Sequence, residues 1–135
     1  MPVVAGARTL RGELEAATER LAAAGIETAR VDAEWLLAGV IGIGRFDASL
    51  AADRVLSAAL AERFEAAVRR RARREPLQRI LGWEGFRGLL IRLTDDVLVP
   101  RPETEMLAEW ALELLPRSAP GRRPLAVDEI GRAHV

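Results

Sequence analysis

The chain has 135 residues, half of them apolar, which suits one ordinary domain or a small domain and the beginning of another. Its 20 basic residues are all arginine and balance 20 acidic ones, which argues against a protein held to nucleic acid by bulk charge alone. It has no cysteine and one histidine, so a disulfide framework and a zinc cluster are excluded, and we expect no metal site.

Nothing in the sequence predicts contact with a membrane. The first eight residues lack the charged start and long apolar run of a secretory signal, and no apolar stretch reaches the roughly 18 residues that span a bilayer. Together with the absence of cysteine, this favours a soluble protein of the reducing cytoplasm.

The segment before residue 45 predicts two helices. Thr9 is placed to cap the first helix and Gly25 to end it. Apolar residues at three- and four-residue steps give it one buried face, made of Leu10, Leu14, Ala17 and Leu21. The second helix is expected over about residues 28–41, because Gly42 and Gly44 break it. Its predicted buried side holds Val31, Trp35, Leu36 and Val40.

A third long helix is predicted from Ser57, a suitable N-terminal cap, to Pro76, which ends the run. The preceding residues 45–56 fit a loop with a short helical turn at 49–53. Near its end the third helix carries five arginines, namely Arg69, Arg70, Arg71, Arg73 and Arg74. Cations at a helix C-terminus complement the helix dipole, and Arg71 or Arg74 can pair with Glu75, so we favour a structural role.

Residues 80–93 are dense in aromatic and branched side chains and predict a β-hairpin that turns at Arg87-Gly88. The next pair, Asp95-Asp96, predicts a turn and not a metal site. Beyond a polar connector, residues 125–128 predict one short buried strand. Three tryptophans each lie on an apolar stripe and are predicted to anchor cores: Trp35, Trp83 and Trp110.

The segment from Leu98 to Glu105 is built to place charges. Pro100 and Pro102 bias the residues before them toward extended backbone, so the chain should arrive straight and turn into a helix that starts at Pro102. Its first turn holds Glu103 and Glu105, where carboxylates complement the helix dipole. Pro116 is expected to stop it, after an apolar face of Leu107, Trp110, Ala111 and Leu114. Local signals alone describe a well-capped amphipathic helix.

Three motifs occur in the order and at the spacing of a known family. They are residues 30–37, residues 70–89, and the run Val99-Pro100-Arg101-Pro102-Glu103-Thr104-Glu105. Over about residues 9–128 the sequence resembles the HemK/PrmC family, the peptide chain release factor glutamine methyltransferases.

The resemblance implies an α-helical N-terminal bundle, a β-hairpin linker, and the first helix and strand of an α/β class I (Rossmann-like) methyltransferase domain. The helical substrate-recognition domain would span residues 1–76, the linker 77–99 and the methyltransferase start 100–128. S-adenosylmethionine is the implied cofactor and a peptide chain release factor the implied partner. The Pro100 segment would then lie beside the cofactor and the substrate entrance, with contacts from Arg101, Glu103, Thr104 and Glu105.

The sequence departs from the family pattern after Asp128. In the family, a glycine-rich run that begins with aspartate binds S-adenosylmethionine, and residues 129–135 do not continue it. A later Asn-Pro-Pro-Tyr segment holds the glutamine amide, and this sequence has neither Asn nor Tyr. We therefore expect no catalytic residue, a chain that stops before the cofactor loop and is inactive alone, and a non-family tail. An assembly artefact is one explanation of that tail.

Two other functions stay open at this point. One is a non-enzymatic helical adaptor that binds protein or ribosomal RNA through the Arg-rich helix, although no aromatic residues interleave with its arginines. The other is a related methyltransferase that acts on a ribosomal protein. In a fragment, exposed Leu and Trp on the helix from Pro102 predict a sticky, marginal fold.

Overall fold

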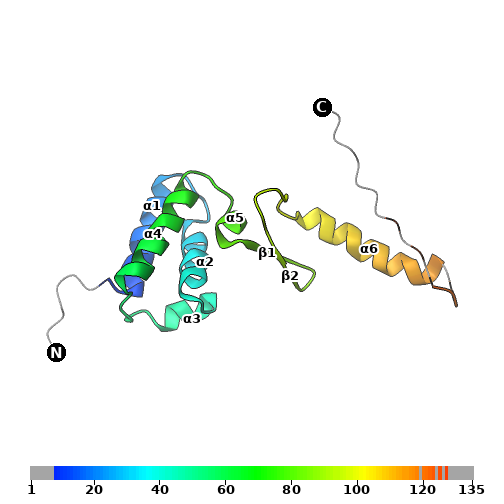
Figure 1. Ribbon diagram of the computed structural model, residues 1–135, viewed down its shortest axis with the longest axis horizontal. Coiled ribbons are helices and arrows are strands. Elements are labelled where there is room, and N and C mark those ends of the chain that lie inside the picture. Colours follow the sequence, from blue (N-terminus) through cyan, green and yellow to red (C-terminus); the bar gives the residue numbers. More distant parts are fainter. Residues whose placement is uncertain (1–7, 119, 124, 126, 128–135) are drawn as a thin grey trace.

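The computed structural model describes residues 8–118, 120–123, 125 and 127. Helices gather at the N-terminal end, a β-hairpin follows, and a long last helix extends away from both, so the molecule is elongated (Figure 1). None of the described helices combines the length and the apolar character needed to cross a membrane. The predicted order of helices, hairpin and helix is confirmed.

Three helices form a bundle with its own core: α1 (Leu10–Ala23), α2 (Ala29–Ile41) and α4 (Ala58–Ala72). The predicted caps are confirmed, since Thr9 Oγ1 accepts the Gly12 amide at 3.2 Å and Ser57 Oγ accepts the Leu60 amide at 3.3 Å. The predicted apolar face of α1 is buried in full. The largest side chains of the core are Phe64, Leu10, Leu21, Leu36, Leu37 and Val68.

Val31, a predicted core position of α2, lies on the exposed face of the helix. Val31 is 41% exposed, whereas Asp32, Ala33 and Leu36 are buried. A step of 100° per residue places Val31 opposite that buried stripe. The polar Asp32 misled the prediction, because it takes an inward position that an apolar pattern does not anticipate.

The buried Asp32 is paired within the bundle. Its Oδ2 accepts the Arg71 Nε–H at 2.6 Å, and its Oδ1 accepts the Thr28 hydroxyl at 2.9 Å. Arg71 also donates to the Glu75 carbonyl oxygen at 3.0 Å, so one guanidinium ties α2 to the end of α4. A buried charge is tolerated only with such partners.

The loop after α2 contains a short helix that starts earlier than predicted. It is α3 (Arg45–Leu50), where a turn at residues 49–53 was expected. Gly44 is extended and starts the helix, and the Arg45 guanidinium lies over the rings of Trp35 (5.5 Å) and Phe46 (4.6 Å). The contact with Trp35 joins residues on two different helices and so left no local signal in the sequence.

The third predicted helix ends before Pro76. Arg74 has a φ of +71°, which no helical residue adopts, and the chain then enters a short helix, α5 (Leu77–Leu81). Ile80 and Leu81 are therefore helical, whereas the sequence predicted that they belong to the hairpin. The hairpin itself pairs β1 (Trp83–Phe86) with β2 (Leu89–Arg92) in antiparallel register, and it turns at Arg87-Gly88 as predicted.

The hairpin packs on the bundle through two tryptophans. Trp35 of α2 and Trp83 of β1 meet edge to face, with ring centroids 5.7 Å apart and planes at 76°. Both are half-buried, in agreement with their predicted anchoring role. Trp110 was predicted to be an anchor as well, and this is wrong here: its side chain is 60% exposed, because no element covers that face of its helix.

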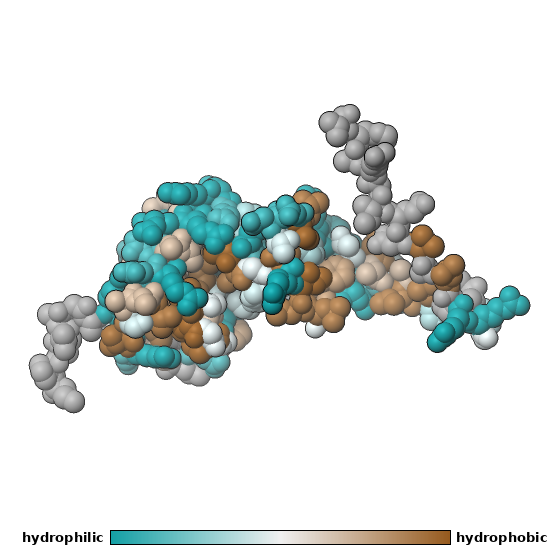
Figure 2. All heavy atoms as spheres, viewed as in Figure 1, coloured by the Kyte–Doolittle hydropathy of each residue, from teal (hydrophilic) through white to brown (hydrophobic). Residues whose placement is uncertain are grey.

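The last helix, α6 (Pro102–Ser118), runs through Pro116, which was expected to stop it. In the final turn proline removes a single hydrogen bond, so the helix continues for two more residues. Apolar side chains are visible over the hairpin and α6 (Figure 2). The strand expected at residues 125–128 lies partly outside the described residues, which omit Ala126 and Asp128; Leu125 and Val127 are described as exposed and are not assigned to a strand.

Candidate functional site

The segment predicted to carry contacts forms the corner between the hairpin and α6. Pro100 is half-buried and precedes the helix, and Pro102 is the first helical residue, as the proline pattern predicted. The Thr104 amide donates to the Arg101 carbonyl oxygen at 3.0 Å, which closes the first turn. This rigid corner presents short and charged side chains side by side.

Two hollows flank the corner and share Arg101. The smaller, about 120 Å³, lies between the hairpin and the start of α6, and its lining includes Glu84, Phe86 and Glu105. The larger, about 530 Å³, lies between the α5 end of the linker and the corner, and its lining includes Arg79, Leu98 and Thr104. Arg101 has no ion pair among the described residues, so its charge is available to a ligand in either hollow.

Three of the four predicted contact residues line a hollow, and the fourth does not. Arg101 and Thr104 line the larger hollow, and Arg101 and Glu105 line the smaller one. Glu103 is exposed and lines neither. Glu105 is engaged by the protein itself, since its Oε1 accepts the Arg87 backbone N–H at 2.6 Å. The fifth predicted position, Asp128, lies outside the described residues.

Arg79 contributes to the corner although the sequence did not single it out. Its guanidinium donates to three backbone carbonyl oxygens, those of Thr94 (3.0 Å), Asp95 (3.2 Å) and Val97 (2.6 Å). The loop that leads into Pro100 is therefore held by one side chain. Carbonyl partners exist at every residue, so no residue type could have signalled this contact. Asp95 and Asp96 form the predicted turn.

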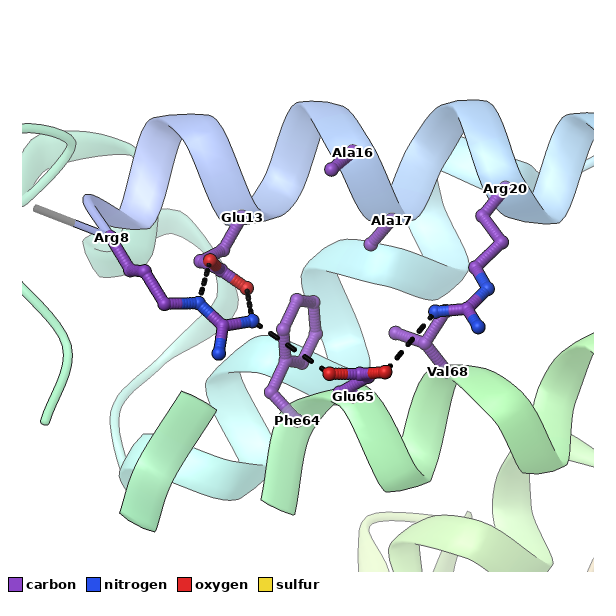
Figure 3. A pocket seen from close by; sticks show the side chains of 8 residues that line it. All are labelled: Arg8, Glu13, Ala16, Ala17, Arg20, Phe64, Glu65 and Val68. Carbon is purple, nitrogen blue, oxygen red and sulfur yellow. Dashed lines mark hydrogen bonds and ion pairs between the residues drawn. The ribbon is translucent and has the colours of Figure 1, made fainter. Parts of the chain in front are cut away.

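A further hollow lies in the bundle, between the start of the chain, α1 and α4. It measures about 260 Å³, and Figure 3 shows Phe64 and Val68 at its floor with Arg8 and Arg20 reaching toward Glu65. Arg8 pairs with Glu13 at 2.5 Å, and this hydrogen bond raises the pKa of Arg8. Acidic and basic side chains face one another around the rim, and the ion pair of Arg20 with Glu65 joins α1 to α4. We therefore assign this hollow a structural role.

Comparison with known proteins identifies the bundle and the start of the linker. The family model of the PrmC N-terminal domain matches residues 14–82, just over half of the chain. The chain belongs to the PrmC family. Its members extend the likeness further along the chain: release factor glutamine methyltransferases of Mycolicibacterium smegmatis and Geobacter sulfurreducens are 45% and 40% identical over 111 residues. That of Agrobacterium fabrum is 35% identical over 126 residues, or 93% of the chain.

The chain spans about two fifths of the length of the PrmC relatives that it matches. The alignments with the first two relatives cover 82% of this chain and 39% of each relative, and the alignment with the Agrobacterium protein covers 44% of that relative.

The Arg-rich end of α4 serves the PrmC fold. Arg69 pairs with Glu65 at 2.9 Å, and Arg70 binds Glu75 through Nε at 2.8 Å, while Arg71 binds the buried Asp32. Arg74 donates to the Ala24 carbonyl oxygen at 3.2 Å. The predicted structural role is confirmed for these four arginines and not for Arg73, and Arg70, instead of Arg71 or Arg74, forms the ion pair with the Glu75 carboxylate. Cations already paired in this way are poor candidates for an RNA site.

The described residues form one sheet, a two-stranded antiparallel hairpin, and the binding of S-adenosylmethionine stays a prediction. Among the described residues no buried side-chain nitrogen or oxygen lacks a hydrogen-bond partner. The same residues hold no group of three His, Cys, Asp or Glu able to bind a metal ion.

Proposed function

We propose that this chain is the N-terminal part of an S-adenosylmethionine-dependent methyltransferase of the cytoplasm, which methylates a glutamine side-chain amide in peptide chain release factors. One observation carries the proposal: proteins named release factor glutamine methyltransferase are 45% and 40% identical to this chain over 82% of its length. The observed fold supports it, because a helical bundle, a hairpin and a helix follow one another as the family resemblance implies.

The three parts have separate tasks in this proposal. The helical domain, residues 1–76, recognises the release factor, and the hairpin linker, residues 77–99, joins it to a class I methyltransferase domain that starts at residue 100. The extended arrangement supports this division, since the bundle has a complete core whereas α6 presents uncovered apolar residues. Such a face suits a helix that packs on the sheet of the next domain.

The corner at Pro100 would form the edge of the reaction site. A carboxamide nitrogen is a weak nucleophile because its lone pair is delocalised into the carbonyl, so the enzyme must orient it toward the methyl group that the cofactor supplies. The exposed Arg101 and Thr104 line one hollow and are suited to hold the substrate chain there, with Glu103 beside them. None of them supplies the chemistry, and we propose that the 135-residue chain alone is inactive.

The test joins residues 1–127 of this chain to the remainder of the Mycolicibacterium smegmatis relative. This chimera is incubated with S-adenosylmethionine and a purified bacterial release factor, and mass spectrometry locates the product. We expect one methyl group on one glutamine, and none with the 135-residue chain alone. A chimera that is folded by circular dichroism and binds the cofactor, yet leaves the release factor unmodified, would refute the proposal.

The same samples test the other functions. Methylation of a ribosomal protein in place of the release factor would support the related methyltransferase. Binding of ribosomal RNA by the chain at moderate salt, without binding of a release factor, would support the adaptor. We expect neither, because Arg69, Arg70, Arg71 and Arg74 already bind groups of the protein itself.

A further inference from the structure

Glu105 is the best-anchored residue in the first turn of α6. It is half-buried, whereas Pro102, Glu103 and Thr104 around it are exposed. Its carboxylate oxygen lies 2.6 Å from the backbone nitrogen of Arg87 at the tip of the hairpin, 18 residues earlier in the chain. A hydrogen bond from a backbone N–H to a carboxylate is charge-assisted and stronger than one to a neutral acceptor.

The hairpin tip is shaped to offer this N–H. Phe86 pairs with Leu89, so Arg87 and Gly88 form a two-residue turn, with φ values of +47° and +76°. Both values are positive, as in turns of type I′, where Asn-Gly is the favoured pair. The N–H of the first turn residue takes no part in the strand ladder and needs a partner elsewhere. Glu105 is that partner.

Arg87 makes contacts outside the turn that explain why an arginine occupies this position. A left-handed conformation is unfavourable for a residue with a long side chain, and such outliers persist where the surroundings require them. The Arg87 guanidinium reaches Glu109, at 3.7 Å between Nη1 and Oε1. Glu105 and Glu109 are one helical turn apart on the same face of α6. The backbone and the side chain of one residue thus contact two neighbouring carboxylates.

These contacts complete a connected path from the bundle to α6. The Trp35–Trp83 contact joins the bundle to β1, and the Leu93 amide extends the hairpin ladder by donating to the Gly82 carbonyl oxygen at 2.9 Å. The clasp formed by Arg87, Glu105 and Glu109 then joins the hairpin tip to α6. Besides this clasp, the corner between the hairpin and α6 is held by Arg79, which binds the loop before Pro100.

We propose that Glu105 is a positioning residue, which acts through Arg87 to fix the angle between α6 and the hairpin. The meaning of this angle rests on the proposed function: α6 starts the methyltransferase domain, so the clasp sets where the reaction site lies relative to the bundle that holds the release factor. Glu105 is thereby assigned to orientation and not to a contact with substrate or cofactor.

The first test measures this orientation in the full 135-residue chain. The sequence has no cysteine, so the substitutions Ala59→Cys on α4 and Glu113→Cys on α6 provide unique sites for two spin labels. Pulsed electron paramagnetic resonance then gives the distribution of distances between them. We expect Glu105→Ala to widen that distribution about twofold, since one strong hydrogen bond at the corner is lost.

The matched control is Glu103→Ala in the same helical turn, since Glu103 has no hydrogen bond or ion pair among the described residues, and it should leave the distribution unchanged. Arg87→Asn keeps the backbone donor and suits the turn, but removes the contact with Glu109, so a smaller widening is expected. Equal distributions for the original chain and the Glu105→Ala variant, with unchanged circular dichroism, would overturn the proposal.

The second test uses the chimera described above. A positioning role predicts that Glu105→Ala raises the KM for the release factor about tenfold while the KM for S-adenosylmethionine is unchanged, because only the presentation of the protein substrate is disturbed. A fall in kcat at constant KM would instead make Glu105 a contact at the reaction site and overturn the positioning role. The distance measurement needs no turnover, so failure of the proposed function and failure of the clasp are distinguishable.

Discussion

Helix α4 of the bundle and helix α6 have similar apolar patterns, but only α4 buries its apolar face. In α4, Ala61, Phe64 and Val68 recur at three- and four-residue steps and are buried. In α6, Leu107 and Trp110 recur at the same steps and remain more than half exposed. An apolar stripe therefore shows which face of a helix can be buried, and a second element with a matching face decides whether it is.

This contrast implies that the bundle and α6 contribute unequally to the free energy of unfolding. The bundle pairs its buried Asp32 carboxylate with two side chains, Thr28 and Arg71, and packs three helices around one core, so it should carry most of the free energy of unfolding. None of the described α6 side chains is buried, and α6 is held at its N-terminal turn by the clasp. The following changes test this division, from the largest expected effect to the smallest.

The largest effect is expected from the core. Phe64→Ala should lower the free energy of unfolding by about 3–5 kcal/mol, because it leaves a cavity between α1 and α4. Trp110→Ala on α6 should change it by less than about 0.5 kcal/mol. Urea denaturation followed by circular dichroism gives both values. Comparable losses would show that α6 is buried by something in solution and would break the comparison.

The next effect concerns the buried ion pair. Asp32→Ala leaves the Arg71 guanidinium without its carboxylate and should destabilise the bundle by about 3 kcal/mol. The matched control, Arg30→Ala, breaks an exposed pair with Glu34 on the same helix and should cost under about 1 kcal/mol. Thermal denaturation of both variants provides the comparison. A small loss for Asp32→Ala would mean that the bundle depends on its apolar core alone.

A smaller effect is expected at the start of α4. Ser57→Ala removes the oxygen that accepts the Leu60 amide and should cost about 1 kcal/mol, whereas Ser57→Asp retains an acceptor and should be close to the original protein. In α6, Glu103→Ala should leave the unfolding midpoint unchanged, because that helix contributes little to the cooperative unit. Chemical denaturation separates the three variants, and equal midpoints for the two Ser57 variants would contradict the capping role.

The smallest effect depends on pH. A hydrogen bond from Arg70 lowers the pKa of Glu75 from its ordinary value of 4.5. The folded protein thus binds this proton less readily than the unfolded chain, so the contribution to stability is complete above pH 4.5 and is lost as the pH falls through the lower folded-state pKa.

Both side chains of that pair are partly exposed, so the contribution should be under about 1 kcal/mol. Glu75→Gln should remove it, and the difference in stability between Glu75→Gln and the original protein should shrink as acid is added. A difference that stays constant from neutral pH to pH 3 would show that the ion pair does not stabilise the bundle.

Local signals in the sequence predicted the elements that depend on them. Thr9 and Ser57 mark true helix starts, and Arg87-Gly88 marks a true hairpin turn, because caps and turns are decided within a few residues. Features decided by distant partners were missed. Asp32 is buried since Arg71, 39 residues away, neutralises it, and α3 starts where Arg45 meets Trp35.

The candidate site shows the same limit. The proline pattern predicted a helix start at Pro102, which is observed, whereas the predicted straight approach stays a prediction. Which first-turn carboxylate is engaged could not be predicted, since Glu103 and Glu105 have equal chemistry and only the folded hairpin brings Arg87 to one of them. The roles of Arg101 and Thr104 toward a substrate stay predictions.

The edge-to-face contact of Trp35 and Trp83 gives the molecule a built-in optical signal. Two indole rings 5.7 Å apart, with planes at 76°, are close enough for their electronic transitions to couple. Because one ring belongs to the bundle and the other to the hairpin, the coupled band in the circular dichroism spectrum reports whether the two are docked. Trp110, remote and solvated, contributes only a background to that band.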